Sequence, residues 1–325
     1  MQKNESRLLI ESAALGVVGA LGAQLFTWML RVCNHFFLQT LAGYSMPSVE
    51  GRLTQQIGPH GLWLVPVVTT VGGLLSGFLV YRFAPEAEGH GTDTAVNAFH
   101  RNGGVIRARV APVKMVASAI TIGSGGAAGR EGPIALIAAG LGSLYARLAK
   151  RPEEDRRLLL LAGMAAGLSA IFRSPMGTGV FAIEVLYGEM EFEVGALLYT
   201  MLASAVAYTV NGAFVGFAPL FRIPKIPTPR FAEYAAYAVL GLAAGVIGTL
   251  LPEAFYRIRD LFRRLPVPVW TKPAVGGLAL GLLALQLPQV LGGGYGWIQL
   301  AISGSLALKL LLLLLFAKLI AFSLT

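Results

Sequence analysis

A glycine-rich stretch that ends in two opposite charges is the part of this chain best suited to chemistry. It reads Gly-Ser-Gly-Gly-Ala-Ala-Gly-Arg-Glu-Gly-Pro over residues 123–133, here called the glycine-rich loop, and it leads into an apolar segment. Proline suits the first turn of a helix, so we predict that a helix starts within residues 129–133. The N–H groups and positive dipole end of a helix start attract anions, and glycine lets an ion approach the backbone closely. The stretch therefore predicts an anion site made of backbone amides.

Glu131 places a carboxylate at this predicted site. An ionised carboxylate would occupy the place of the anion, whereas a protonated one could leave it, so Glu131 is expected to be both a gate and a proton acceptor. The alternative is that Arg130 and Glu131 form an ordinary surface ion pair in a loop between helices. The apolar sequence on both sides favours the gate, because a charge at membrane depth costs at least about 2.5–3.5 kcal/mol and is functional by default.

The composition around the loop is that of a membrane protein. Of 325 residues, 55% are hydrophobic and 13% are charged, whereas soluble domains average about 25% charged residues. The mean hydropathy is +0.66. The single cysteine, Cys33, excludes a disulfide within one chain and a site of several cysteine ligands, and we expect no metal and no cofactor. The net charge of +9 fits basic cytoplasmic loops better than nucleic-acid binding.

About ten apolar segments follow one another along the chain. They cover residues 8–37, 62–84, 110–122, 134–148, 158–172, 176–187, 195–210, 231–251, 267–287 and 298–324. A spanning helix needs about 20 apolar residues, and several of these segments are shorter. Because unwound backbone at membrane depth is tolerated only where protein buries it or where it lines a cavity, the interruptions indicate a transport pathway. We expect an all-α polytopic membrane protein that transports and is not an enzyme.

Basic residues alternate between the loops and predict a topology. They lie before the first segment, after the second, and after the segment that follows the glycine-rich loop: Lys3 and Arg7; Arg101, Arg107 and Arg109; Lys150, Arg151, Arg156 and Arg157. The intervening loop, residues 39–60, has only Arg52 as a basic residue. By the positive-inside rule the N-terminus is cytoplasmic, and we expect a multi-pass protein of the plasma membrane.

The chain also contains an internal repeat. Residues 114–121 (Lys-Met-Val-Ala-Ser-Ala-Ile-Thr) align with residues 318–325 (Lys-Leu-Ile-Ala-Phe-Ser-Leu-Thr), and a glycine cluster lies upstream of each, at residues 89–91 and 292–294. Two halves with broken helices at corresponding positions are typical of repeat-built transporters. We therefore expect one transmembrane anion-transport domain over residues 1–325, with a first repeat at about 8–210 and a partial second repeat at about 231–325.

These motifs resemble the CLC family of chloride channels and chloride–proton antiporters. Gly129-Arg130-Glu131-Gly132-Pro133 is similar to the family signature GREGP. Residues 84–91 resemble the first anion-coordinating loop, Pro-Val-Lys at 112–114 precedes the signature as expected, and residues 172–184 resemble a later proline-containing turn and acidic helix end. The resemblance covers roughly residues 10–325.

The resemblance implies a CLC-like bundle of tilted and broken helices in two inverted repeats, and a homodimer with one pore per subunit. It implies gating by Glu131. It also implies anion binding by a set of residues from the two loops: Gly89, His90, Gly91, Gly129, Arg130 and Gly132. The expected partners are chloride or another small anion such as fluoride, nitrate or bicarbonate, protons, and the lipid bilayer.

Two residues depart from the family pattern. His90 stands where the family has an anion-facing serine; its ring N–H could donate to an anion, or the side chain could point into solvent. Val185 stands where proton exchangers of the family carry an internal glutamate, which favours a channel over an antiporter as the first hypothesis. The antiporter remains the alternative, with a nearby acidic cluster as either a substitute proton acceptor or a solvated helix end: Glu189, Glu191 and Glu193.

The family's Gly-x-Phe-x-Pro loop and its late anion-contacting tyrosine have no counterpart before Thr325. We therefore expect a truncated chain with an incomplete second repeat and a half-built anion site, which would not conduct.

Two other function classes stay open at this level. An intramembrane serine protease could use Ser124, but its base would have to be one of four histidines that lie in loops or at segment ends: His35, His60, His90 and His100. A non-conducting structural module is the other. The dinucleotide-like pattern over residues 123–128 lacks the strand–helix–strand context that such a site needs.

Overall fold

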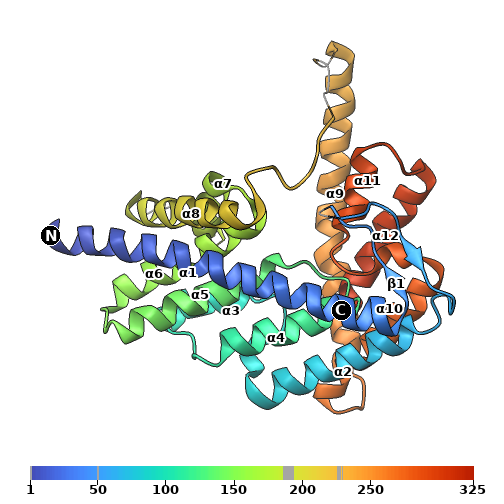
Figure 1. The fold of residues 1–325 in the computed structure, drawn as a ribbon, viewed down its shortest axis with the longest axis horizontal. Coiled ribbons are helices and arrows are strands. Elements are labelled where there is room, and N and C mark those ends of the chain that lie inside the picture. The colour runs from blue at the N-terminus through green and yellow to red at the C-terminus, as the bar shows by residue number, and fades with distance from the viewer. Residues whose placement is uncertain (1, 50, 186–193, 225–227, 229) are drawn as a thin grey trace. The chain divides into compact units, whose positions relative to one another are not determined.

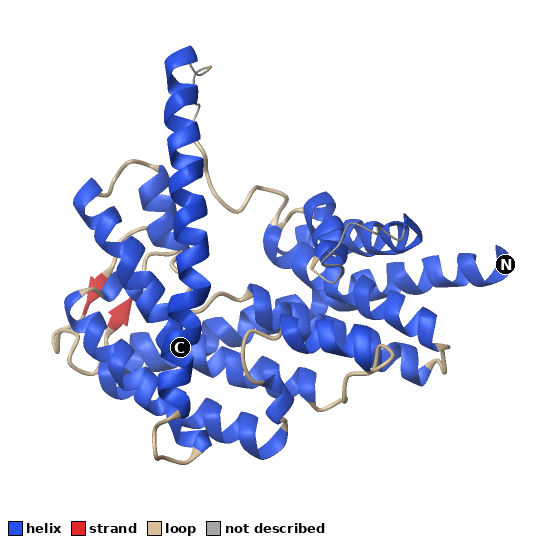
Figure 2. Ribbon diagram, turned by 180° about the vertical axis from the view of Figure 1, so that it is seen from behind, coloured by secondary structure: helices blue, strands red, loops and turns tan. Residues whose placement is uncertain are grey.

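The computed structural model of this chain describes residues 2–49, 51–185, 194–224, 228 and 230–325. Helices make up nearly all the regular structure of these residues (Figure 1). Figure 2 shows the one sheet of the described part, an antiparallel ribbon of β1 (Tyr44–Ser45) and β2 (Gln56–Ile57). The protein is all-α, as expected from its apolar segments.

Twelve α-helices and four shorter helical turns are described. The α-helices are α1 (Gln2–Asn34), α2 (Val65–Phe83), α3 (Thr92–Arg101), α4 (Val110–Gly123), α5 (Glu131–Leu148), α6 (Glu153–Phe172), α7 (Pro175–Glu184), α8 (Val194–Val215), α9 (Phe231–Arg263), α10 (Lys272–Gln286), α11 (Tyr295–Ile302) and α12 (Leu308–Leu324). The turns are the π-helix η1 (His35–Leu41) and the 3₁₀ helices η2 (Pro85–Ala87), η3 (Val269–Thr271) and η4 (Pro288–Val290).

The chain forms two compact units from interleaved segments. Unit 1 comprises Met1–Asn34, Leu75–Gly123 and Gly129–Leu220, and unit 2 comprises His35–Leu74, Ser124–Ala128 and Phe221–Thr325. The glycine-rich loop is therefore shared: Ser124–Ala128 belongs to unit 2, whereas Gly123 and the part from Gly129 onward, with the Arg-Glu pair, belong to unit 1.

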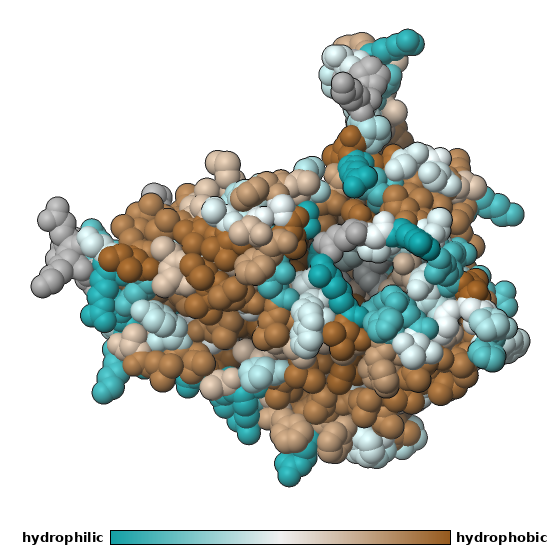
Figure 3. Space-filling view, viewed as in Figure 1, coloured by the Kyte–Doolittle hydropathy of each residue, from teal (hydrophilic) through white to brown (hydrophobic). Residues whose placement is uncertain are grey.

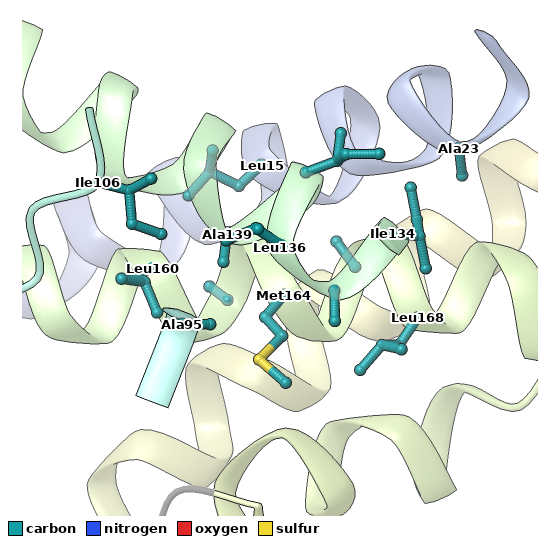
Figure 4. Close-up of a cluster of buried hydrophobic side chains, with 14 of the residues drawn as sticks. Leu15, Ala23, Ala95, Ile106, Ile134, Leu136, Ala139, Leu160, Met164 and Leu168 are labelled. Atoms are coloured by element: carbon teal, nitrogen blue, oxygen red, sulfur yellow. The ribbon is translucent and has the colours of Figure 1, made fainter. Parts of the chain in front are cut away.

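The core of unit 1 lies where α5 and α6 pack against α1 and α8 (Figure 4). Ile134, Leu136, Leu160 and Met164 are fully buried there. Small residues let α5 and α6 approach closely: a Cβ atom added to Gly163 would come within 2.5 Å of the carbonyl oxygen of Ala138. Close packing at small residues is the usual way in which helices associate in lipid.

Four helical stretches of the described part are long and apolar enough to cross a membrane: Glu5–Leu41, Val65–Phe83, Gly195–Val215 and Phe231–Arg263. Helix α9 has no buried residue at all, and apolar side chains cover much of the face seen in Figure 3. Apolar surface of this extent requires lipid or another protein as its neighbour. Helices α3, α7 and α11 have only 10, 10 and 8 residues and cannot span alone.

The apolar segment at residues 298–324, expected to be continuous, is broken into α11 and α12. Helix α11 ends in a Schellman motif, in which the Gly304 N–H donates to the Ala301 carbonyl at 3.0 Å and the Ser305 N–H donates to the Leu300 carbonyl at 2.9 Å. The left-handed φ of +69° at Gly304 makes this turn possible. Two further differences are α3, which no apolar segment predicted, and α9, which continues through Pro252 to Arg263.

Two segments that carry the aligned lysines share one order of local structure, while the bounds predicted for the two repeats stay a prediction. Each copy runs from a long helix through a 3₁₀ turn that starts at proline, then through a glycine loop and a short helix, to a helix that carries lysine. The first copy is α2, η2, α3 and α4, and the second is α10, η4, α11 and α12. Both glycine loops use left-handed backbone, at Gly89 (φ +74°) and Gly91 (φ +105°) in the first and at Gly292 (φ +60°) and Gly294 (φ +74°) in the second.

Candidate functional site

The first loop of the candidate site is held in place from α4. The ammonium group of Lys114 donates hydrogen bonds to the carbonyl oxygens of Ala87 at 3.0 Å and Gly89 at 2.5 Å. Lys114 is only 5% exposed. The loop then turns through Gly91, the residue that precedes α3. A buried lysine thus fixes the backbone just before the start of a helix.

The second part of the site is the start of α5. Arg130 precedes the helix and Glu131 is its first residue, as the signature predicted. Gly129, Glu131 and Gly132 are half-buried. A Cβ atom added to Gly129 would collide with the carboxylate of Glu131. The carboxylate therefore turns back over Gly129, and the first N–H groups of α5 have no partner within the helix.

The two parts are in direct backbone contact within unit 1. A Cβ atom added to Gly132 would come within 2.5 Å of the carbonyl oxygen of His90, and one added to Gly91 would come within 2.9 Å of the carbonyl oxygen of Gly132. The structure thus brings together the two groups of residues that the sequence joined in one site, at the starts of α3 and α5. His90 is exposed. That these residues bind an anion stays a prediction.

A cavity of about 510 Å³ flanks α3 on its polar side, with Glu86, Asp93, Asn97 and Arg107 in its wall. Arg107 forms an ion pair with Glu86. Burial alone would raise the pKa of Glu86, but a hydrogen bond from its backbone N–H, the hydrogen bond and charge of Arg107 and the charge of Arg109 together hold the pKa below its ordinary value. With two carboxylates in its wall, this cavity is a poorer place for an anion than the helix starts are.

The residues that the family resemblance links to proton coupling lie at the end of α7. Arg173 ends α6 in the left-handed conformation (φ +55°), and α7 begins at Pro175 and ends at Glu184. Glu184 is exposed, whereas Val185 is half-buried and packs against the hydrophobic core of unit 1. The acidic cluster that could replace the internal proton acceptor lies outside the described residues: Glu189, Glu191 and Glu193.

Lys114 and Lys318 are functional candidates to which the sequence assigned no role: both were marked as members of a repeat, and Lys114 also as part of the Pro-Val-Lys motif. Lys318 in α12 donates to the carbonyl oxygens of Val290 at 2.7 Å and Gly292 at 2.6 Å, which is the arrangement that Lys114 makes in unit 1. The sequence did contain a signal for both residues: each is a lysine within an apolar segment, where a charge is costly and is retained for a function.

Comparison with known proteins gives matches over most of the chain. The family described as voltage gated chloride channel matches residues 72–325. A protein of Ralstonia nicotianae that is named as a ClcB-like chloride channel protein is 33% identical over 288 residues, which are 87% of this chain and 65% of that protein. The H(+)/Cl(-) exchange transporter ClcA of Salmonella agona is 31% identical over 274 residues, which are 82% of this chain and 58% of that protein. The chain therefore spans about three-fifths of the length of these relatives.

Solved structures show the same fold. A slow cyanobacterial Cl-/H+ antiporter superposes with a TM-score of 0.82 at 21% identity, over 98% of this chain and 73% of the antiporter. A CLC-type fluoride/proton antiporter superposes with a TM-score of 0.79 at 23% identity, over 98% of this chain and 75% of that one. The fold is thus that of a polytopic membrane transporter. Because the family match covers most of the chain and includes the glycine-rich loop, both lysines and the starts of α3 and α5, the chain belongs to the voltage gated chloride channel family.

Proposed function

We propose that the starts of α3 and α5 bind chloride or another small anion on its way across the membrane, and that Glu131 gates this path. The observation that carries the proposal is the contact between the two loops, with the Glu131 carboxylate folded over Gly129 at the start of α5. The anion would be held by backbone amides around Gly89, Gly91, Gly129 and Gly132, with Arg130 and His90 adding positive or hydrogen-bonding groups.

The arrangement suits an anion for physical reasons. Each helix start carries roughly half a positive charge, and α3 and α5 bring two of them to one place. Where protein or lipid excludes water, these partial charges act more strongly than they would in solution. Glycine at four of these positions keeps side chains out of the way, which allows close approach to the amides.

Glu131 acts in this proposal as a competitor of the anion. When ionised it accepts hydrogen bonds from the amides that the anion needs, and when protonated it loses most of this advantage. A hydrogen bond to a charged group contributes about 1.5–3 kcal/mol, so protonation would shift the competition about tenfold or more in favour of the anion.

We further propose that flux is passive and channel-like. Val185 supports this, because an aliphatic side chain packed into the core cannot relay protons. Exchange of chloride for protons is the second candidate, and the names of the ClcA relatives favour it.

The proposal also includes a homodimer in the plasma membrane with a cytoplasmic N-terminus. Transport is preferred to proteolysis by Ser124, because the chain's family is one of chloride channels.

The test is chloride flux into liposomes that contain the full-length form of the protein with Glu131→Gln. The neutral amide has the shape of the carboxylate without its charge, so it should not compete with the anion. Wild-type uptake of labelled chloride is expected to rise about tenfold or more as the medium is acidified from about pH 8 to about pH 4. The variant is expected to be high and flat over the same range.

Glu153→Gln is the matched control, because Glu153 is exposed and pairs with Arg157 one turn away. It should keep the pH response of the wild type. A Glu131→Gln variant that still responds to pH like the wild type would rule Glu131 out as the gate. Uphill proton movement driven by a chloride gradient would decide for exchange over passive flux.

A further inference from the structure

Lys318 is a positively charged residue within the apolar helix α12. It is the one charged residue at positions 310–324 of α12. Its ammonium group donates to the carbonyl oxygens of Val290 and Gly292, at 2.7 Å and 2.6 Å. Charged residues inside membrane helices are costly and are retained for a function. No part of the anion site described above includes Lys318.

The two hydrogen bonds of Lys318 set the direction of the peptides in the second glycine loop. In a trans peptide the C=O and N–H groups point to opposite sides. Binding the Gly292 carbonyl to Lys318 therefore turns the N–H of Gly293 away from α12. The loop can adopt this path because Gly292 has a φ of +60°, a conformation that glycine reaches without strain.

The same loop holds the first half of the glycine-rich loop. The N–H of Gly292 donates to the carbonyl oxygen of Gly125 at 3.0 Å. A side chain at Gly125 would meet Leu291 within 3.2 Å. Lys318 thus acts on the glycine-rich loop through one intermediate residue, Gly292, and all of these groups lie in unit 2.

A second group from α12 holds the same segment. The hydroxyl of Thr325 accepts a hydrogen bond from the N–H of Ala127 at 2.9 Å and donates one to the carbonyl of Ala321 at 3.0 Å. Lys318 and Thr325 lie two helical turns apart, which puts them on the same side of the α12 axis. One side of α12 therefore holds the segment Ser124–Ala128 directly at Ala127, through Thr325, and indirectly at Gly125, through the Gly292 peptide that Lys318 binds.

Lys114 makes the equivalent bonds in unit 1, to the carbonyl oxygens of Ala87 and Gly89 in the first loop. The repeat therefore supplies each glycine loop with its own lysine. In unit 1 the held loop is the one that contacts Gly132. In unit 2 the held loop binds the segment whose chain continues directly into Gly129.

We propose that Lys318 is a positioning residue for the glycine-rich loop: together with Thr325 it fixes the segment Ser124–Ala128, and so the backbone from which the amides at Gly129 and the carboxylate of Glu131 are presented. The inference rests on the proposed function, because its effect is read at the anion site. Loss of Lys318 should weaken anion binding without contact between Lys318 and the anion.

The test compares Lys318→Met with the wild-type chain in the thermal unfolding of purified protein. Unfolding is followed in increasing chloride, with the bulky anion isethionate as the reference, since a bound ligand raises the unfolding temperature according to its affinity. We expect the variant to unfold near the wild-type temperature in isethionate and to bind chloride about tenfold more weakly or worse. Lys318→Arg should restore most of the affinity, because it keeps two N–H donors.

Lys309→Met is the matched control, the same substitution in the same helix at an exposed position, and it should bind chloride like the wild type. Wild-type affinity in Lys318→Met would overturn the inference. No chloride response in the wild type itself would overturn the proposed function, and the inference with it. If Lys318→Met does not fold, Thr325→Val decides: weaker chloride binding supports the inference, and unchanged binding overturns it.

Discussion

Replacement of Gly132 by alanine is expected to weaken anion binding about tenfold or more while leaving most of the fold in place. The new Cβ atom would lie within 2.5 Å of the His90 carbonyl oxygen, closer than two such atoms can remain. Overpacking of this kind typically costs about 1–3 kcal/mol. The strain is relieved by moving the first loop away from the start of α5, which separates the two halves of the site. Chloride affinity should therefore fall about tenfold or more, the equivalent of 1.4 kcal/mol or above.

The measurement is the chloride dependence of the unfolding temperature, as for Lys318. Gly245→Ala is the matched control, because a Cβ atom at Gly245 in α9 meets nothing within 4 Å. That variant should match the wild type in both stability and chloride affinity. If Gly132→Ala binds chloride as tightly as the wild type, the contact between His90 and Gly132 is not part of an anion site.

Replacement of Gly163 by leucine is expected to prevent unit 1 from folding. A Cβ atom at Gly163 already meets the Ala138 carbonyl at 2.5 Å and the backbone of Gly142 at 3.2 Å. A whole leucine side chain would force α5 and α6 apart along the most extensive contact between two described helices. Helix α5 begins with Glu131 and buries Ile134 and Leu136 in the same core. The free energy of unfolding should therefore fall by more than about 4–5 kcal/mol, which is beyond the range of most single substitutions.

Size-exclusion chromatography of the detergent-solubilised protein measures this outcome directly. Gly163→Leu should give aggregated protein or none, whereas Gly241→Leu, on the exposed surface of α9 with nothing within 4 Å of its Cβ position, should elute like the wild type. A single, thermally stable peak for Gly163→Leu would show that the α5–α6 contact is looser than described.

Much of the site could be read from the sequence because its chemistry is carried by local motifs. The signature at residues 129–133 marks both a helix start and a carboxylate in an apolar setting, and the structure begins α5 at Glu131. The repeated lysine and glycine clusters marked two related segments, which the structure builds with the same local geometry. Apolar length predicted the class of protein and most helices.

What the sequence did not reveal depends on contacts between distant segments or on single backbone angles. Helix α3 carries few apolar residues, so hydropathy gave no sign of it, although its start forms half of the candidate site. The break between α11 and α12 depends on the left-handed φ of Gly304. The sequence does not show which of its many glycines adopts such an angle. The approach of Gly91 to Gly132 depends on the packing of α3 against α5, and no local pattern encodes that.

The central claim is that an anion binds where α3 and α5 begin, and that Glu131 competes with it. Crystals of the wild type and of Glu131→Gln soaked in bromide test this most directly, because bromide replaces chloride and is located by its anomalous scattering. We expect a bromide peak at hydrogen-bond distance, roughly 3–3.5 Å, from the first amides of α5 and next to Gly91, with higher occupancy in Glu131→Gln than in the wild type. Bromide at other positions only, with none beside Gly91 and Gly132 in either protein, would contradict it.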